Sequence, residues 1–464
     1  MRKILPIIFL IISFLIYLTL FSYLSILKHY SFNSSLFDLG IFEQTIWNTS
    51  KGKFFQQSLS LVSPGNFLGD HFSLILLFLA LIYRIIPKTE TLLICQTIFL
   101  ASGIFPLYLI GIHFLKNRWA ALFIGISYLL YPALEFANLF DFHIITLIIP
   151  LIFWGFYFYF KNKKLVALLF FLLALLVKED ISLIILGIGF FMIIQKDFKF
   201  GSFLSVLSLC WFFLTTKVFI PYFNSSTYGY LYRYKFLGNS FSQILITILT
   251  KPIFTLKYAF SFKKVLYLRN LFKPVCYLSI FGGPIIIPLL ITLSFSLLSN
   301  YSPQFSIKYH YSISSIPFIF LGIIFAIVNI SKLVNKKQPI IFLFSLLIFL
   351  TSFFTNLDLG PKPFLLFNEY KIENHQLLLK EFLNQIPEKV PVSAQNTIGP
   401  HLIKREKIYR FPVINDAEFI ILDLKATNFG VPEKKFKKAV KELKNNPDFC
   451  LIKEKDKIML FKKC

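Results

Sequence analysis

The sequence predicts an all-α polytopic membrane bundle of about 11 transmembrane helices over residues 1–360, followed by a small soluble α/β domain over 361–464. Hydrophobic residues make up 56% of the chain and the mean hydropathy is +0.68, well above the values of soluble domains. Apolar runs of bilayer length recur before residue 360 and disappear after it. These observations together predict the fold class.

The first element is an uncleaved transmembrane helix. Basic residues Arg2 and Lys3 precede an apolar run over 4–27, which is too long for the core of a signal peptide. No cleavage site of small residues follows it. The helix therefore starts in the cytoplasm.

The remaining spans follow from apolar runs between short polar turns. Including the first, the expected spans are 4–27, 91–115, 119–135, 143–160, 164–178, 181–195, 201–220, 265–281, 284–299, 312–331 and 339–357. The outer loops are expected at 28–90 and 221–264, and the C-terminal domain outside the cytoplasmic membrane of a bacterium.

The apolar segment 71–87 decides the orientation of every later span. If it lies on the outer surface as a juxtamembrane helix, the cytoplasmic turns hold twelve basic residues against one acid, Asp197. That asymmetry follows the positive-inside tendency, whereas a crossing segment would reverse it. The same turns and a basic tail account for the net charge of +25, so we expect no nucleic-acid partner.

The C-terminal domain has the pattern of a small α/β fold. We expect strands at 390–395, 407–411 and 417–424, an amphipathic helix at 433–446 and a hairpin at 450–461. Cys450 and Cys464 flank this hairpin, and their offset from its turn disfavours a disulfide. Ser393, Asn396 and His401 fit either an acceptor site or ordinary turn chemistry.

Acidic residues gather on the outer side. Nine of the ten acids in the first 360 positions fall there, and carboxylates near hydrocarbon are costly enough to suggest function. Four motifs contain the acids that are the best candidates for a functional role: FDLGIFEQ with Asp38 and Glu43, GDHF with Asp70 and His71, FDFH with Asp141 and His143, and VKEDIS with Lys178, Glu179 and Asp180. Taken singly, each fits a helix cap or a polar turn equally well.

Because all four motifs lie at the outer ends of early spans, we expect them to converge on one cavity. The candidate catalytic residues are Asp38, Asp141, His143, Asp70 and His71. Asp38, Asp141 and His143 are also candidate ligands of a divalent ion, Mg²⁺ or Mn²⁺. The candidate substrate-binding residues are Glu43, Lys178, Glu179, Asp180, His310 and, for a phosphate, Arg233, Lys235 and Lys308.

The motifs resemble a family of bacterial multi-spanning proteins catalogued as domain of unknown function 2079. The matching stretches are FDLGIFEQTIWN, GDHFSLIL, FDFH, LVKEDISL, IKYHYSISSIPF, VSAQNTIGPHL and IYRFP. That family in turn resembles the type-C (GT-C fold) glycosyltransferases that use polyprenyl-phosphate sugars. The resemblance implies a catalytic acid at Asp38 and a second acidic position at Asp141. The chain departs from those glycosyltransferases at Ser73-Leu74, where they commonly have a proline.

Three functions remain open at this point. The first is a glycosyltransferase that moves a sugar from a polyprenyl-phosphate donor to a glycan, lipid or protein acceptor at the outer face. The second is a transporter or flippase, which the placement of charges at span ends disfavours. The third is a non-catalytic envelope protein that keeps the fold and binds membrane lipid or a partner.

Overall fold

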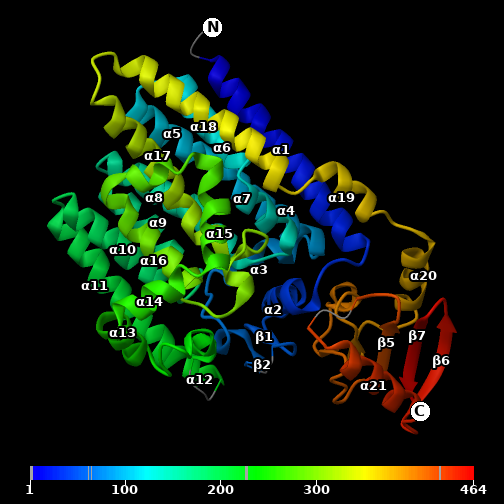
Figure 1. Cartoon of the computed structure of the whole chain (residues 1–464). Helices are drawn as coiled ribbons and strands as arrows, with labels where there is room; N and C mark the ends of the chain where they lie inside the picture. The colour runs from blue at the N-terminus through cyan, green and yellow to red at the C-terminus, as the bar shows by residue number, and fades with distance from the viewer. Residues whose placement is uncertain (1–3, 61, 64, 225–227, 428–429) are drawn as a thin grey trace.

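The computed structural model of the chain describes residues 4–464, apart from 61, 64, 225–227 and 428–429. A helical bundle forms the larger part, and a small sheet domain lies at one end of it, next to the chain's C-terminus (Figure 1). The start of α1 lies at the opposite end. Arg2 and Lys3, two of the expected cytoplasmic charges, fall outside the described residues.

Helices long and apolar enough to cross a bilayer form the frame of the bundle. Within the described ranges there are five, or six if one bent pair counts as a span. They are α1 (Leu5–Tyr30), α4 (Thr89–Ser102) with α5 (Ile104–Leu115), α11 (Phe198–Leu214) with α12 (Ile220–Asn224), α17 (Ile316–Ser331) with the helical turn before it (His310–Ser315), and α18 (Lys337–Leu359) with α19 (Pro363–Glu369). The bent pair is α6 (Arg118–Leu129) and α7 (Pro132–Phe140), at 41°.

Shorter apolar helices fill the space between these. They are α3 (Leu76–Ile85), α8 (Ile148–Phe160), α9 (Lys164–Leu175), α10 (Ile181–Ile194), α13 (Phe241–Thr250) and α16 (Ile286–Leu297). The prediction of a multi-span helical membrane bundle is confirmed. The count of eleven spans stays a prediction, because several of these helices are shorter than a bilayer is thick.

The segments 71–87 and 265–281 can be compared with the structures that the sequence predicts for them. Within 71–87 the chain forms α3, a helix of 10 residues and too short to cross by itself, as a juxtamembrane helix would be. The expected span 265–281 is not one helix. Here α15 (Phe262–Phe272) stops before Pro274, and Cys276 and Tyr277 take positive φ values of 52° and 57°.

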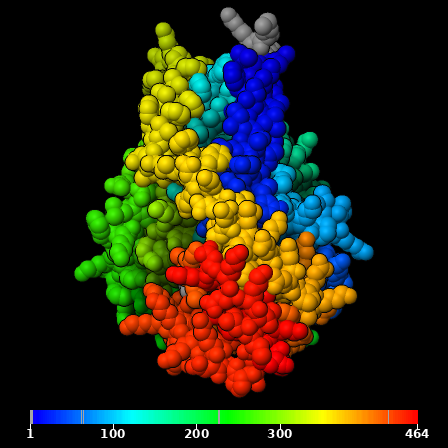
Figure 2. Space-filling view, turned by 90° about the vertical axis from the view of Figure 1, so that its right-hand side faces the viewer, coloured from blue at the N-terminus to red at the C-terminus, as the bar shows by residue number. Residues whose placement is uncertain are grey.

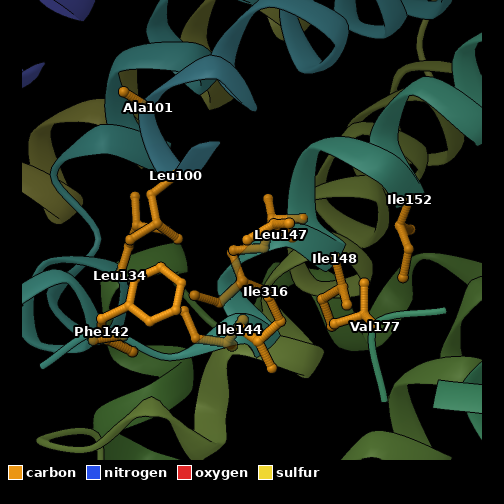
Figure 3. Packing of buried hydrophobic residues seen from close by; sticks show 14 of the residues in the cluster. Leu100, Ala101, Leu134, Phe142, Ile144, Leu147, Ile148, Ile152, Val177 and Ile316 are labelled. Carbon is orange, nitrogen blue, oxygen red and sulfur yellow. The ribbon is translucent and has the colours of Figure 1, made fainter. Parts of the chain in front are cut away.

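Part of the hydrophobic core lies between α6 and the helices α1, α5 and α18 around it. α6 packs between α1 and α18, and Figure 2 shows this stack rising away from the C-terminal domain. Gly103 at the α4–α5 junction permits close approach, because a Cβ there would lie 2.6 Å from the Tyr128 hydroxyl. Leu100 of α4, Leu134 of α7 and Phe142 in the turn after α7 lie near one another in the buried cluster (Figure 3).

The two long loops that the sequence predicts on the outer side carry short elements. The first holds α2 (Ile41–Ser50) and a two-stranded ribbon of β1 (Gln56–Gln57) and β2 (Gly65–Asn66). The second holds the turn Gly229–Tyr234, α13 and α14 (Pro252–Ala259).

The C-terminal domain is a mixed five-stranded sheet in the order β4-β3-β5-β7-β6. β3 runs parallel to β4 and β5, and β7 pairs antiparallel with β5 and β6. The bounds are β3 (Val392–Ala394), β4 (Ile408–Arg410), β5 (Phe419–Asp423), β6 (Phe449–Lys455), β7 (Ile458–Lys463), α20 (Asn374–Leu383) and α21 (Glu433–Lys444). The expected strands, helix and hairpin are therefore confirmed.

The expectation for the two terminal cysteines was wrong. Cys450 and Cys464 form a disulfide, with Cα atoms 5.5 Å apart. Cys450 lies opposite Lys462 in the ladder, and the Cys464 amide donates to the Asp448 carbonyl. The two cysteines are diagonal neighbours across the hairpin, and diagonal side chains remain within reach of each other.

Candidate functional site

Asp38 lies in a π-helical turn, Leu36–Gly40, between α1 and α2. The Ser35 hydroxyl caps this turn by accepting from the Phe37 amide at 3.1 Å. The Asp38 carboxylate is 3.3 Å from His143 Nε2 and its side chain is 13% exposed. Asp38 and His143, which are 105 positions apart, thus form a pair.

His143 is fixed from two sides. Its amide donates to Oε1 of Gln96 on α4 at 2.7 Å, and its ring stacks on His310 with 3.6 Å between centroids. The sequence reasoning overlooked Gln96. The available signal was a buried amide side chain in an otherwise apolar span.

A second set of contacts surrounds Asp70 and His71. Asp70 accepts from Ser60 Oγ at 2.6 Å and from the Tyr230 hydroxyl at 2.5 Å. The rings of His71 and Tyr230 stack at 4.7 Å with an interplanar angle of 7°. Burial and the adjacent Asp70 raise the pKa of Tyr230 well above its usual range, so its hydroxyl stays a donor.

Glu179 contacts this second set of residues but does not itself line the cavity. It is fully buried, lies 3.0 Å from His71 Nδ1 and accepts from the Tyr228 hydroxyl at 2.9 Å. Burial by itself would raise the pKa of Glu179, but the contact with His71 outweighs it and holds that pKa below its usual range. Tyr228 and Tyr230, both in the loop 221–264, are therefore structural partners of the early acids.

Arg233 is surrounded by aromatic rings. Its guanidinium lies 4.7 Å from the centroid of Tyr230, 4.6 Å from that of Tyr301 and 5.6 Å from that of Tyr311. In the described part of the chain no carboxylate forms an ion pair with it. A cation held this way is ordered by cation–π contacts yet free to meet an anion.

These groups line one cavity of about 530 Å³. Its polar wall includes eight of the predicted residues: Asp38, Asp70, His71, His143, Lys178, Asp180, Arg233 and His310. Two buried polar atoms at this wall, Asp180 Oδ1 and His310 Nδ1, have no hydrogen-bond partner among the described residues. The four motifs thus converge, as the sequence predicts.

Much of the remaining lining of the cavity is apolar. It includes side chains of three helices, α10, α11 and α13: Ile181, Leu183, Ile184, Phe212, Phe241, Ile244 and Ile248. On α13, Leu245 and Leu249 are 57% and 71% exposed. This helix therefore separates the cavity from an apolar outer surface.

Five predicted residues lie outside the cavity lining: Glu43, Asp141, Glu179, Lys235 and Lys308. Glu43 is fully buried and accepts from Tyr83 at 2.7 Å and from Thr89 at 2.8 Å. Burial raises the pKa of Glu43 to about 7. Lys235 and Lys308 are exposed.

Asp141 makes structural contacts. It forms an ion pair with Lys28 at 3.1 Å and accepts from the Ser35 amide at 3.0 Å, and so connects the end of α1 with the turn that holds Asp38. Burial raises the pKa of Asp141 to about 6, although Lys28 opposes this rise. A catalytic role for Asp141 remains a prediction, alongside this positioning role.

A double-mutant cycle separates these roles. Asp141→Asn is expected to lower the free energy of unfolding by about 2–3 kcal/mol, because it leaves the Lys28 ammonium buried without a counter-charge. Adding Lys28→Met should recover most of that loss in thermal melts of the purified protein. The exposed pair Lys273–Asp358 is the control, and Asp358→Asn should cost less than about 1 kcal/mol. Unchanged stability of Asp141→Asn would contradict the positioning role.

The site does not suit a metal ion. Among the described residues, no group of three or more histidine, cysteine or acidic side chains is placed to hold one. Of the three residues expected as ligands, Asp38 and His143 face each other, but both carboxylate oxygens of Asp141 are taken by Lys28 and Ser35. We therefore derive no step through a metal.

The C-terminal domain holds the turn that contains Asp38. The Asn396 carbonyl accepts from the Leu36 amide at 2.8 Å, and its side-chain oxygen accepts from the Phe37 amide at 3.3 Å. Gly399 allows this approach, since a Cβ there would lie 2.5 Å from the Leu36 side chain. Asn396, which fitted either an acceptor site or a turn, is thus a contact between the two domains.

The fold and the family of the chain can be compared with those of known proteins. The fold is similar to the crystal structure of ArnT from Cupriavidus metallidurans bound to undecaprenyl phosphate, with a TM-score of 0.55, 10% identity and 97% of each chain covered. The apo ArnT structure from the same organism has a TM-score of 0.48 at 9% identity, covering 91% of this chain and 93% of that one. No curated protein sequence matches.

The likeness to bound ArnT shows that the two proteins share a fold over nearly the whole chain. At 10% identity it does not extend to activity. A family model described as "Predicted membrane protein (DUF2079)" matches residues 28–457, which include all four acidic motifs and the C-terminal sheet as far as the end of β6. The chain belongs to this DUF2079 family of membrane proteins.

Proposed function

We propose that the protein is an integral-membrane glycosyltransferase that moves a sugar from a polyprenyl-phosphate donor to an acceptor at the outer face of the cytoplasmic membrane. The observation that carries this proposal is the mixed lining of the cavity, which combines carboxylates, histidines and the Arg233 guanidinium with many apolar side chains. A lipid phosphate likewise combines a charged group with an apolar chain. The likeness to a fold that binds undecaprenyl phosphate in ArnT supports this choice.

Asp38 is the proposed general base. It would take the proton of an acceptor hydroxyl as that oxygen forms a bond to the anomeric carbon of the sugar. His143, 3.3 Å away, would orient the carboxylate. The bond between the anomeric carbon and the phosphate oxygen breaks in the same step, and its electron pair leaves with the polyprenyl phosphate.

Arg233 is the proposed partner of the departing phosphate. Negative charge grows on that phosphate as the bond breaks, and a preorganised cation in a water-poor cavity stabilises it. His71 stacks on Tyr230, one of the rings around Arg233, and it also lines the cavity. Asp70 and Glu179 would act through these residues as positioning groups.

The proposed orientation places the C-terminal domain outside. The basic turns at the far end of the bundle favour a cytoplasmic position for that end. The Cys450–Cys464 disulfide supports an oxidising compartment for the sheet domain.

The test is release of polyprenyl phosphate. Purified protein is incubated with membrane lipid extracts of its host that contain polyprenyl-phosphate sugars, and free polyprenyl phosphate is followed by mass spectrometry. We expect release that depends on time and on an added envelope fraction as acceptor. Lipid bound without any release would favour a non-catalytic lipid-binding protein, and transfer of intact lipid between leaflets of liposomes would favour a flippase.

A further inference from the structure

A second cavity lies at the other end of the bundle from the candidate site. It has a volume of about 350 Å³ and is lined by residues from α5, α6 and α8 and the turns after them: Leu109, Ile112, His113, Lys116, Arg118, Tyr157 and Lys161. The labels of α5 and α6 in Figure 1 mark this end, far from the sheet domain. The proposed transfer reaction does not use this cavity.

The rim of the cavity is cationic. Lys116, Arg118 and Lys161 bring three positive charges to it from two separate turns, and no acidic residue lines it. Within the described ranges no carboxylate forms an ion pair with Lys116 or Lys161. The one acid expected at this end, Asp197, pairs instead with Lys164 at 2.6 Å. An anion at this rim would be attracted to Lys116 and Lys161 together.

The α5–α6 turn is held rigidly. The Asn117 side chain caps α6 by accepting from the amides of Trp119 at 3.1 Å and Ala120 at 3.0 Å. Gln338, at the start of α18, donates to the Leu115 carbonyl at 3.2 Å. Lys116 ends α5 in the left-handed conformation, with φ of 54°. The backbone that presents Lys116 and Arg118 is thus ordered without any ligand.

The floor of the cavity is apolar and follows the span. Ile112 and Leu109 lie on α5 about one and two turns before Lys116, so they extend about 10 Å along the helix from the rim. Both are only partly buried, as is Tyr157 on α8. Lys161 lies 5.9 Å from the centroid of Tyr157, above this floor. A soluble anion would gain nothing from such a floor, whereas a lipid would lay an acyl chain along it.

We propose that this cavity binds an anionic glycerophospholipid, with its phosphate between Lys116, Arg118 and Lys161 and an acyl chain against Leu109 and Ile112. Basic pockets between transmembrane helices at a membrane surface bind lipid head groups in this manner. The site is separate from the proposed transfer reaction, so it stands whether or not the protein is an enzyme.

The test compares two double variants in detergent. Lys116→Ala with Lys161→Ala removes two charges of the rim, and Lys332→Ala with Lys336→Ala removes two exposed charges from the α17–α18 turn, which do not line the cavity. Binding of phosphatidylglycerol, phosphatidylcholine and inorganic phosphate is measured by native mass spectrometry. We expect the rim variant to weaken phosphatidylglycerol binding about tenfold or more, with phosphatidylcholine unchanged.

The control variant should bind phosphatidylglycerol within about twofold of wild type. Equal weakening by both variants would overturn the proposal, because it would show attraction to total charge alone. Saturation by inorganic phosphate at the same affinity as phosphatidylglycerol would also overturn it, since the apolar floor would then contribute nothing. Thermal melts of both variants, expected to match wild type because the four lysines are exposed, confirm that neither is misfolded.

Discussion

Asp38→Asn is expected to lower the rate of sugar transfer by at least about 100-fold, because asparagine cannot accept the proton of the acceptor hydroxyl. The side chain keeps its size and the contact with His143, so the fold should be unchanged. Release of polyprenyl phosphate by the purified variant measures the loss. Binding of polyprenyl phosphate itself should stay within about threefold of wild type, since the proposed phosphate partner is Arg233.

Asp358→Asn is the matched control for this prediction. Asp358 is an exposed acid at the end of α18, paired with Lys273 and outside the cavity lining. Its replacement should leave transfer within about twofold. Full activity of Asp38→Asn would remove the assigned base, and an equal loss in both variants would show that the effect is not specific to the cavity.

Arg233→Ala is expected to weaken binding of polyprenyl phosphate about 10- to 100-fold. The guanidinium offers charge-assisted hydrogen bonds to phosphate, and such bonds contribute roughly 1.5–3 kcal/mol each. Tyr230 and Tyr301 already hold it in place, so little ordering cost opposes binding. Arg233→Lys should recover part of the affinity, because it restores charge but not the planar fork. Binding is measured by native mass spectrometry with undecaprenyl phosphate.

Lys235→Ala provides the comparison. Lys235 lies two residues further on in the same loop and carries the same charge, but it is exposed and does not line the cavity. We expect its replacement to change binding less than twofold. If both variants weaken binding alike, the loop attracts the lipid only by its net charge, and Arg233 has no specific role.

The candidate site was predictable to the extent that topology determines which residues share one side of the membrane. Asp38, His71, His143 and Asp180 were placed there by counting lysines in the turns, and the structure brings them to one cavity. Spacing along the sequence does not indicate which side chains contact each other. It therefore predicts that Asp141 acts together with His143, whereas in the structure Asp141 forms an ion pair with Lys28.

Partners at long sequence separation escaped prediction. Gln96, Tyr228 and Tyr230 hold the cavity residues, and each belongs to a segment with no acidic motif of its own. Asn396 reaches Ser35 across 361 positions. A single sequence holds no record of which distant segments meet, because many pairings of polar side chains satisfy the same hydrogen-bonding needs.

By itself the sequence determined the membrane class, the positions of most helices, the short helix within 71–87 and the strands of the C-terminal sheet. These follow from local physics, since hydropathy, periodicity and charge near the bilayer act on each segment separately. Only the tertiary structure shows that Asp38 contacts His143 and that Asp141 forms an ion pair with Lys28. The same is true of the tyrosines around Arg233 and of the disulfide between Cys450 and Cys464. Those pairings depend on packing and register between segments far apart in the chain, which no local pattern specifies.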